Sequence, residues 1–240
     1  RPDVLINCAA CNQVDEAEDN PELAYKVNSE AVRNLAILCK KYNIFLVHFS
    51  TDYVFDGRKG DFYTEQDAPN PLSNYGLSKL KGEQAVRTQA GRFLLFRLSW
   101  LFGDGENNFF AKLEKWARGK GSIKIVQDEV SSPTYAYDVV DAVLKAVEAD
   151  LSGLYHLSND GYCSRYELAK YYFQKTGNNV TVVPVSSGEI PVKAKRPAFS
   201  PMSHQRIREK LGITMPSWQD AVDRFLIRKN IIFKEDKEKR

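Results

Sequence analysis

Short apolar segments and amphipathic segments alternate along the chain from its first residues. Apolar, strand-like runs stand at 4–7, 44–49 and 93–98, and segments with helical spacing lie between them. In one of these segments Leu23, Val27 and Ala31 recur four residues apart. This alternation is typical of a parallel β-sheet whose strands are joined by crossover helices. We therefore expect an α/β fold in which crossover helices cover a parallel sheet.

Helix start signals locate some of the crossover helices. Asn20 followed by Pro21 is typical of an N-cap with proline at the first helical position. Ser164, with Glu167 three residues later, has the spacing of a capping box. Helices are expected at 20–38, 75–89, 107–118, 135–149, 164–175, 203–211 and 217–228, strands at 4–7, 44–49, 93–98, 123–126, 154–157 and 180–185, and a loop at 186–201.

The length of 240 residues suits one large domain with a smaller second part. We expect a first domain at 1–130, a C-terminal part with a small α/β unit at 131–232, and a charged, frayed tail at 233–240. With 43% apolar and 27% charged residues, the composition excludes disordered, collagen-like and disulfide-stapled chains.

Charge and hydropathy exclude several kinds of partner. The formal net charge of +3 comes from 34 basic and 31 acidic residues, a balance that does not favour nucleic-acid binding. No apolar run approaches the ~18 residues of a membrane-spanning helix, so we expect a cytoplasmic protein with no membrane partner. Cys8 and Cys11 have C-x-x-C spacing, but no second pair accompanies them. We expect reduced thiols at a buried strand end and no metal site.

A phenol and an ammonium group, those of Tyr75 and Lys79, stand four residues apart at the start of the helix expected at 75–89. Residues i and i+4 share one helical face, so the two groups come within reach of each other. A neighbouring cation favours the phenolate form of tyrosine and lowers its pKa, which suits acid–base chemistry near neutral pH. The same spacing occurs by chance in many helices, so its surroundings decide its meaning.

The strand expected at 44–49 is followed directly by the polar residues Ser50, Thr51 and Asp52. Ligands of open α/β sheets bind outside the carboxyl ends of the strands. A hydroxyl group here can hydrogen-bond a substrate carbonyl that Tyr75 protonates and Lys79 supports. The alternative is that these residues only cap a turn, which is a common use of Ser, Thr and Asp.

Several segments resemble the dTDP-4-dehydrorhamnose reductases, an extended branch of the short-chain dehydrogenase/reductase superfamily. The Tyr75-x-x-x-Lys79 spacing is common to the superfamily, whereas the run from Ser50 to Gly57 and the pair Ser99-Trp100 narrow the resemblance to this branch. The matching segments are Asn7-Cys-Ala-Ala10, Val14-Asp-Glu-Ala-Glu18, Ser50-Thr-Asp-Tyr-Val-Phe-Asp-Gly57, Asn70-Pro71, Tyr75-Gly-Leu-Ser-Lys79-Leu-Lys-Gly-Glu83, Arg97-Leu-Ser-Trp100, Ser132-Pro133-Thr134 and Lys195-Arg-Pro197.

The resemblance implies a Rossmann-like parallel sheet with crossover helices, in which 1–130 form a truncated dinucleotide-binding domain and 131–232 a mainly substrate-binding part. It also implies reduction of the C4 ketone of dTDP-4-dehydro-L-rhamnose, a nucleotide-linked 4-keto-6-deoxyhexose, with NADPH or NADH as cofactor. It implies that Tyr75 is the general acid, that Lys79 binds the nicotinamide ribose and lowers the pKa of Tyr75, and that Thr51 orients the ketone. A homodimer is a further expectation from the family. Cofactor contacts are expected from Ala9, Ala10, Ser50, Tyr75 and Lys79, and substrate contacts from Val14, Asp52, Tyr53, Trp100, Asn108, Phe109 and Arg196.

Two alternatives from the same superfamily stay open. One is a non-catalytic regulatory subunit that resembles the β subunit of methionine adenosyltransferase. The other is a nucleotide-sugar epimerase or dehydratase. Thr51 and the Ser99-Trp100 pair favour the reductase over the regulatory subunit, and the single acidic residue beside the hydroxyl pair, Asp52, disfavours a dehydratase.

The resemblance lacks one part of the family pattern. A member begins with a strand and a Gly-rich turn that presents a helix N-terminus to the cofactor pyrophosphate, but no glycine precedes Gly57 in this sequence. We therefore expect the N-terminal strands of the Rossmann sheet, about sixty residues, to be missing. We also expect the 240 residues to bind NAD(P)H poorly on their own.

Overall fold

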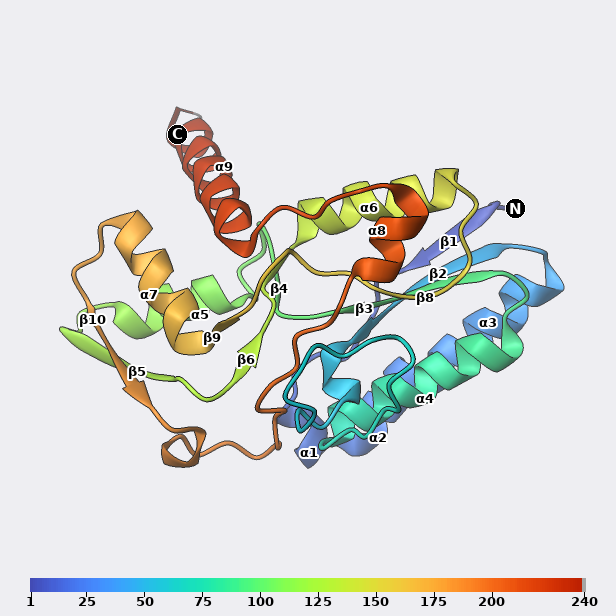
Figure 1. The fold of residues 1–240 in the computed structure, drawn as a ribbon, viewed down its shortest axis with the longest axis horizontal. Coiled ribbons are helices and arrows are strands. Elements are labelled where there is room, and N and C mark those ends of the chain that lie inside the picture. Colours follow the sequence, from blue (N-terminus) through green and yellow to red (C-terminus); the bar gives the residue numbers. More distant parts are fainter. Residues whose placement is uncertain (239–240) are drawn as a thin grey trace.

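A four-stranded parallel sheet forms the centre of one lobe of the molecule (Figure 1). The structure, a computed structural model, describes residues 1–238. The strands follow one another across the sheet in the order β1 (Val4–Asn7), β2 (Phe45–Thr51), β3 (Phe93–Leu98) and β8 (Gly153–His156). Asn7 pairs with His48, and Thr51 pairs with Leu98. Because the strands are parallel, their carboxyl ends lie at the same edge of the sheet.

Helices cover both faces of this sheet. Helix α6 (Ala136–Glu148) lies on one face, and α3 (Ala31–Lys41) and α4 (Asn74–Gln89) lie on the other (Figure 1). Val47 and Phe96 pack in the core beneath α6, whereas Leu46 packs with Val32 of α3 and Val86 of α4. Strands buried on both faces are continuous apolar runs, which explains the composition of β2 and β3.

The first crossover segment contains an irregular turn. The side chain of Asn20 accepts a hydrogen bond from the backbone N–H of Leu23 (3.2 Å) and caps α2 (Pro21–Tyr25). The helix then continues through one π-helical turn, Lys26–Glu30, into α3. Such turns are rare and often occur near functional sites.

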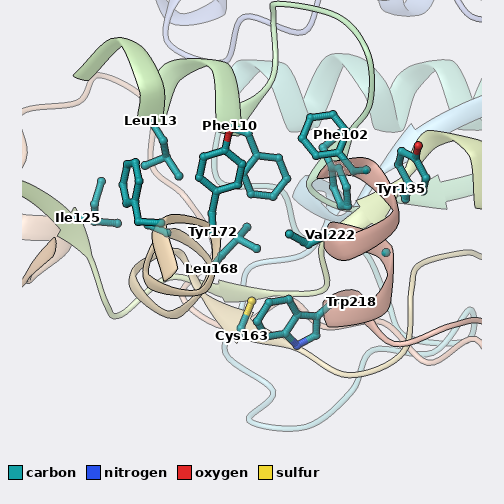
Figure 2. Packing of buried hydrophobic residues seen from close by; sticks show 14 of the residues in the cluster. Phe102, Phe110, Leu113, Ile125, Tyr135, Cys163, Leu168, Tyr172, Trp218 and Val222 are labelled. Atoms are coloured by element: carbon teal, nitrogen blue, oxygen red, sulfur yellow. The ribbon is translucent and has the colours of Figure 1, made fainter. Parts of the chain in front are cut away.

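The second lobe has its own small parallel sheet and an aromatic core. Strand β5 (Ser122–Val126) pairs with β10 (Thr181–Val185), α5 (Phe109–Ala117) and α7 (Arg165–Thr176) pack against this sheet, and α9 (Trp218–Glu238) packs against α7. In this core Phe110 stacks on Tyr172 with ring centroids 4.6 Å apart (Figure 2). Large buried rings supply much of the apolar area that holds these elements together.

Short elements connect the two lobes. Strand β4 (Leu101–Phe102) pairs with β7 (Thr134–Tyr135) in parallel, and β6 (Val130–Ser131) pairs with β9 (Cys163–Ser164) in antiparallel. The other short elements of the fold are α1 (Glu16–Asp19), α8 (Gln205–Leu211) and the 3-10 turns Asp52–Val54 and Ser187–Glu189.

The chain passes between the lobes several times. Core residues of the first lobe lie within 45–98, 139–157 and 207–215, and those of the second lobe lie within 102–135, 163–173 and 218–225. The domain boundary expected at residue 130 stays a prediction. Each of the two cores contains residues from both sides of it.

The α/β fold expected from the alternation of segments is confirmed, and apart from the last helix the expected strands and helices lie within a few residues of their predicted bounds. The capping box of Ser164 and Glu167 is present. The last helix is longer than the sequence predicts, since α9 continues past Arg228 to Glu238 and includes part of the expected tail. Residues 239–240 lie outside the described part of the chain. Among the described residues, no helix is long and apolar enough to cross a bilayer.

Candidate active site

A cavity of about 420 Å³ lies at the carboxyl edge of the main sheet. It brings together Thr51 from the end of β2 and Tyr75 and Lys79 from the start of α4, the three residues predicted to be catalytic. The other lining residues are Cys8, Ala10, Asn12, Phe49, Ser50, Leu98, Trp100, Leu101, Ala136, Val139 and Val140.

The start of α4 fixes the position of Tyr75. The side chain of Ser73 caps the helix by accepting a hydrogen bond from the backbone N–H of Gly76 (3.2 Å). A Cβ atom on Gly76 would lie 2.3 Å from the carbonyl oxygen of Tyr53, so only glycine allows this close approach. The rings of Tyr53 and Tyr75 meet edge to face, with centroids 5.6 Å apart.

Burial raises the pKa of Tyr75 above its usual range, and a hydrogen bond with Thr51 opposes this only in part. The direction is opposite to the lowering expected from the sequence, because the loss of water around the phenol outweighs its favourable contacts. Tyr75 therefore carries its proton at neutral pH, which is the state that a general acid needs.

Lys79 is 3% exposed, and its Nζ donates a hydrogen bond to the carbonyl oxygen of Phe49 (2.6 Å). Burial lowers the pKa of Lys79 to about 8, against the attraction of Glu83 one helical turn later. Glu83 in turn is held by Arg97 of β3, which donates two hydrogen bonds to its carboxylate (2.9 and 2.7 Å). This buried ion pair fixes α4 to the sheet beside the catalytic cavity.

The loop after β1 is held by two buried asparagines. Asn7 accepts a hydrogen bond from the backbone N–H of Ala9 (3.1 Å), and its Nδ2 donates to Nδ1 of His48 (3.1 Å). Asn28, in the π-helical turn, accepts from the N–H of Cys11 (2.9 Å) and donates to the carbonyl oxygen of Cys11 (2.8 Å). The sequence reasoning gave neither asparagine side chain a role, because their partners His48 and Cys11 are 41 and 17 positions away in the chain.

Asn28 also donates to Oγ of Ser78 in α4 (3.0 Å). Its side chain thus joins the loop that lines the cavity to the helix that carries Tyr75 and Lys79. Cys8, expected to be buried, is instead exposed and lines the cavity. All four thiols are free, and no cluster of His, Cys, Asp and Glu side chains that could hold a metal ion is found in the described part of the chain.

The cavity fits one half of a dinucleotide cofactor. The hydroxyl of Ser50 is buried, lines the cavity and has no hydrogen-bond partner in the protein. A buried polar group without a hydrogen-bond partner lowers the stability of the fold, so such a group on a cavity wall is suited to form a hydrogen bond with a ligand. Phe49, Leu98 and Val139 give the cavity apolar walls, and Ala10 allows a flat ring to approach the backbone closely.

Asp52 lies beside the cavity without lining it. Its buried carboxylate accepts hydrogen bonds from the hydroxyls of Thr51 (3.1 Å), Ser131 (3.1 Å) and Ser200 (2.7 Å). Burial raises the pKa of Asp52, and these hydrogen bonds oppose the rise. The carboxylate therefore orients Thr51 and ties it to the segments around Ser131 and Ser200.

Trp100 separates the catalytic cavity from a second cavity of about 590 Å³ and lines both. Its backbone is in the left-handed region (φ 41°), which is uncommon for a residue with a side chain. The guanidinium of Arg165 stacks over the indole at 3.5 Å. The sequence reasoning proposed Trp100 for the sugar but missed Arg165, which stands 65 positions later in the chain.

The second cavity is rich in cations. Arg165, Arg196, Lys112 and Lys124 line it, with Asp15 and Glu129 as the acidic residues. Arg196 donates a hydrogen bond to Asp15 (2.7 Å), whereas no carboxylate in the described part of the chain lies within ion-pair distance of Arg165. Burial lowers the pKa of Arg165, although arginine stays charged in proteins.

The predicted site residues fall into three groups. Thr51, Tyr75, Lys79, Ala10 and Ser50 line the first cavity, and Trp100 lines both. Asn108, Phe109 and Arg196 line the second cavity. The third group lines neither cavity and consists of Ala9, Val14, Asp52 and Tyr53. Of these, Val14 and Tyr53 pack against the buried cluster that contains Tyr75.

The sequence model of the RmlD substrate binding domain matches residues 1–231. The chain belongs to this family. The resemblance to dTDP-4-dehydrorhamnose reductases is thereby confirmed, since curated relatives of this family carry that name. The enzyme of Escherichia coli is 32% identical over 239 residues, which cover 94% of this chain and 79% of that protein.

Other relatives cover the chain to a similar extent. The Bacillus subtilis spore coat polysaccharide biosynthesis protein SpsK is 35% identical over 226 residues, which cover 94% of this chain and 79% of SpsK. The crystal structure of dTDP-4-dehydrorhamnose reductase from Bacillus anthracis in complex with NADP is similar with a TM-score of 0.92. It is 38% identical, and the match covers 95% of this chain and 81% of that chain.

Proposed function

We propose that the chain is an NAD(P)H-dependent reductase that converts the C4 ketone of a nucleotide-linked 4-keto-6-deoxyhexose, dTDP-4-dehydro-L-rhamnose, to the alcohol. The observation that carries the proposal is the placement of Thr51, Tyr75 and Lys79 around one cavity that shares Trp100 with a cation-rich second cavity. The names of the relatives support it, and so does the NADP in the Bacillus anthracis structure.

The residues of the first cavity have separate tasks in this reaction. Tyr75 donates its phenolic proton to the ketone oxygen, and the Thr51 hydroxyl holds that oxygen in place. Asp52 keeps the Thr51 hydroxyl in position, with a distance of 3.1 Å between Oγ1 and the carboxylate. Lys79 is held at its Nζ by the Phe49 carbonyl, and it supports the negative charge that develops near Tyr75.

The cofactor supplies the hydride when bound. Ala10, Ser50 and Lys79 would hold its nicotinamide end, where the unpartnered Ser50 hydroxyl offers a hydrogen bond. NADP is named for the Bacillus anthracis relative, and NADH remains the second choice. The sequence expectations of a homodimer and of a cytoplasmic location stay predictions.

The sugar lies against Trp100, and the diphosphate lies in the second cavity. A planar, fully charged guanidinium suits phosphate oxygens, and Arg165 has its donors free of carboxylates there. Arg196 and the N-cap residue Asn108 stand in the same cavity. Substrate contacts by Val14 and Tyr53 are indirect in this proposal, through their packing against Tyr75 and its surroundings.

The test measures the oxidation of NADPH in the presence of dTDP-4-dehydrorhamnose through the loss of absorbance of the reduced nicotinamide. Tyr75→Phe should abolish turnover and leave substrate binding intact, because it removes one hydroxyl and keeps the ring. Turnover by Tyr75→Phe equal to that of the parent chain would refute the assignment of the acid. Binding of the nucleotide sugar without any turnover, at NADPH concentrations shown to saturate the protein, would favour the regulatory-subunit alternative.

A further inference from the structure

A partly exposed tryptophan stands in the second cavity with no task in the reaction described above. Trp116 of α5 is 42% exposed and lines this cavity. On α5, Lys112 lies three residues after Phe109 and four residues before Trp116. The three side chains therefore share one face of the helix, and all three line the cavity. An exposed indole on a cavity wall is suited to contact a ligand.

Aromatic and cationic groups are arranged in a fixed order along this cavity. The guanidinium of Arg165 lies 3.5 Å from the ring centre of Trp100 and 4.8 Å from that of Phe109. The ring of Phe109 meets the ring of Trp116 edge to face, with centroids 6.3 Å apart. The order from the catalytic cavity outward is therefore Trp100, Arg165, Phe109 and Trp116.

This order matches the order of chemical groups in a nucleoside diphosphate sugar. The sugar has to reach Tyr75 and so lies nearest Trp100, and the diphosphate lies nearest the Arg165 guanidinium. The ribose and the base then extend toward Phe109 and Trp116. Ile190 and Val192 supply apolar side chains to the same cavity, and Val192 is 46% exposed.

We propose that Trp116 is the stacking platform for the nucleobase of the substrate, and that Phe109 separates this base site from the diphosphate site at Arg165. The inference rests on the proposed function, because it takes the diphosphate to lie at Arg165. Stacking on an indole tolerates any base, since every base has a π-face. Trp116 therefore strengthens nucleotide binding without selecting thymine over uracil.

A calorimetric test with three ligands separates the contribution of the base to binding from that of the diphosphate. The ligands are dTDP, UDP and inorganic pyrophosphate. Trp116→Ala should weaken the binding of dTDP and of UDP about tenfold each, which is the usual size of one base-stacking contact. Its affinity for pyrophosphate should stay that of the parent chain. Trp116→Phe should recover most of the loss, because it restores a ring at the same place.

Two further variants serve as controls. Tyr162 is 48% exposed and lines neither cavity, so Tyr162→Ala removes an exposed ring elsewhere and should leave all three affinities unchanged. Arg165→Ala should weaken dTDP and pyrophosphate alike. Thermal unfolding of each variant shows whether it is folded.

Parent-like dTDP affinity in Trp116→Ala would overturn the inference and leave the proposed function standing. An equal loss of dTDP and pyrophosphate in that variant would also overturn it, since the indole would then act on the diphosphate. A parent chain that binds neither dTDP nor UDP would instead refute the proposed function, and the base site with it.

Discussion

The buried ion pair between Arg97 and Glu83 should dominate the stability of the helix that carries the acid and the lysine. Both side chains are 1% exposed, and two hydrogen bonds of 2.9 and 2.7 Å join them. Arg97→Met leaves the Glu83 carboxylate buried without a cation, which costs about 3–5 kcal/mol in free energy of unfolding. For a chain of this size that corresponds to a fall in Tm of roughly 6–20 °C.

A double-mutant cycle isolates the pair. Glu83→Leu alone leaves the Arg97 guanidinium buried without a carboxylate partner, beside His156 Nε2 at 3.4 Å and the Phe55 ring at 5.0 Å, so it should cost a similar amount. The double variant Arg97→Met/Glu83→Leu replaces the pair with apolar side chains and should be more stable than either single variant, because no charge remains buried alone. Urea unfolding followed by circular dichroism measures all four proteins.

Two results would refute this reasoning. One is a loss of less than about 1 kcal/mol in both single variants, which is the range of exposed ion pairs. The other is a double variant whose loss equals the sum of the single losses, since the two side chains would then be uncoupled. A matched effect on activity is also expected: the charge of Glu83 raises the pKa of Lys79, so Glu83→Gln should move the alkaline limb of the pH profile to lower pH.

Four other outcomes follow from the site. Activity should fall above pH about 8, where Lys79 loses its proton, and a pH–rate profile from 6 to 10 would show a flat alkaline limb if Lys79 has no role. Because the pKa of Lys79 is lower in the folded chain (about 8) than its usual 10.5, the unfolded chain binds more protons between these values, and this group should make unfolding harder as the pH rises through that window. Asn28→Ala removes three hydrogen bonds at a buried position and should lower the free energy of unfolding by about 2–3 kcal/mol and raise the KM for NADPH; an unchanged KM would mean that the loop keeps its place unaided. Gly76→Ala forces a Cβ to within 2.3 Å of the Tyr53 carbonyl and should abolish activity, whereas Gly121→Ala, with open space around it, should be neutral in the same assay.

Local signals in the sequence were sufficient for much of the fold. Asn20 with Pro21, and Ser164 with Glu167, specify helix starts through contacts within three residues, and the structure contains both caps. The π-helical turn around Asn28 could not be predicted in this way. Its side chain bonds to Cys11 and Ser78, which are 17 and 50 positions away, so the turn depends on contacts that form only in the folded chain.

The candidate site was predicted where a motif and a strand end coincide, as for Thr51, Tyr75 and Lys79. The direction of the pKa of Tyr75 was wrong, because spacing gives the distance to a cation but not the loss of water around the phenol. Arg165 was missed because its significance depends on stacking over Trp100. No property of Arg165 within its own helix distinguishes it from the other arginines of the sequence.

The repeated passage of the chain between the two lobes fixes the distance between the two cavities. Each core is built from several separate stretches of sequence, so many connecting segments would have to bend at once for the lobes to swing apart. Trp100 lies in one of these connections and lines both cavities. The spacing between Tyr75 and the outer end of the second cavity is therefore set by the fold before a ligand arrives. If the nucleotide sugar spans both cavities as proposed, a sugar joined to its nucleoside by a single phosphate should bind more weakly than the diphosphate, because its linker is shorter.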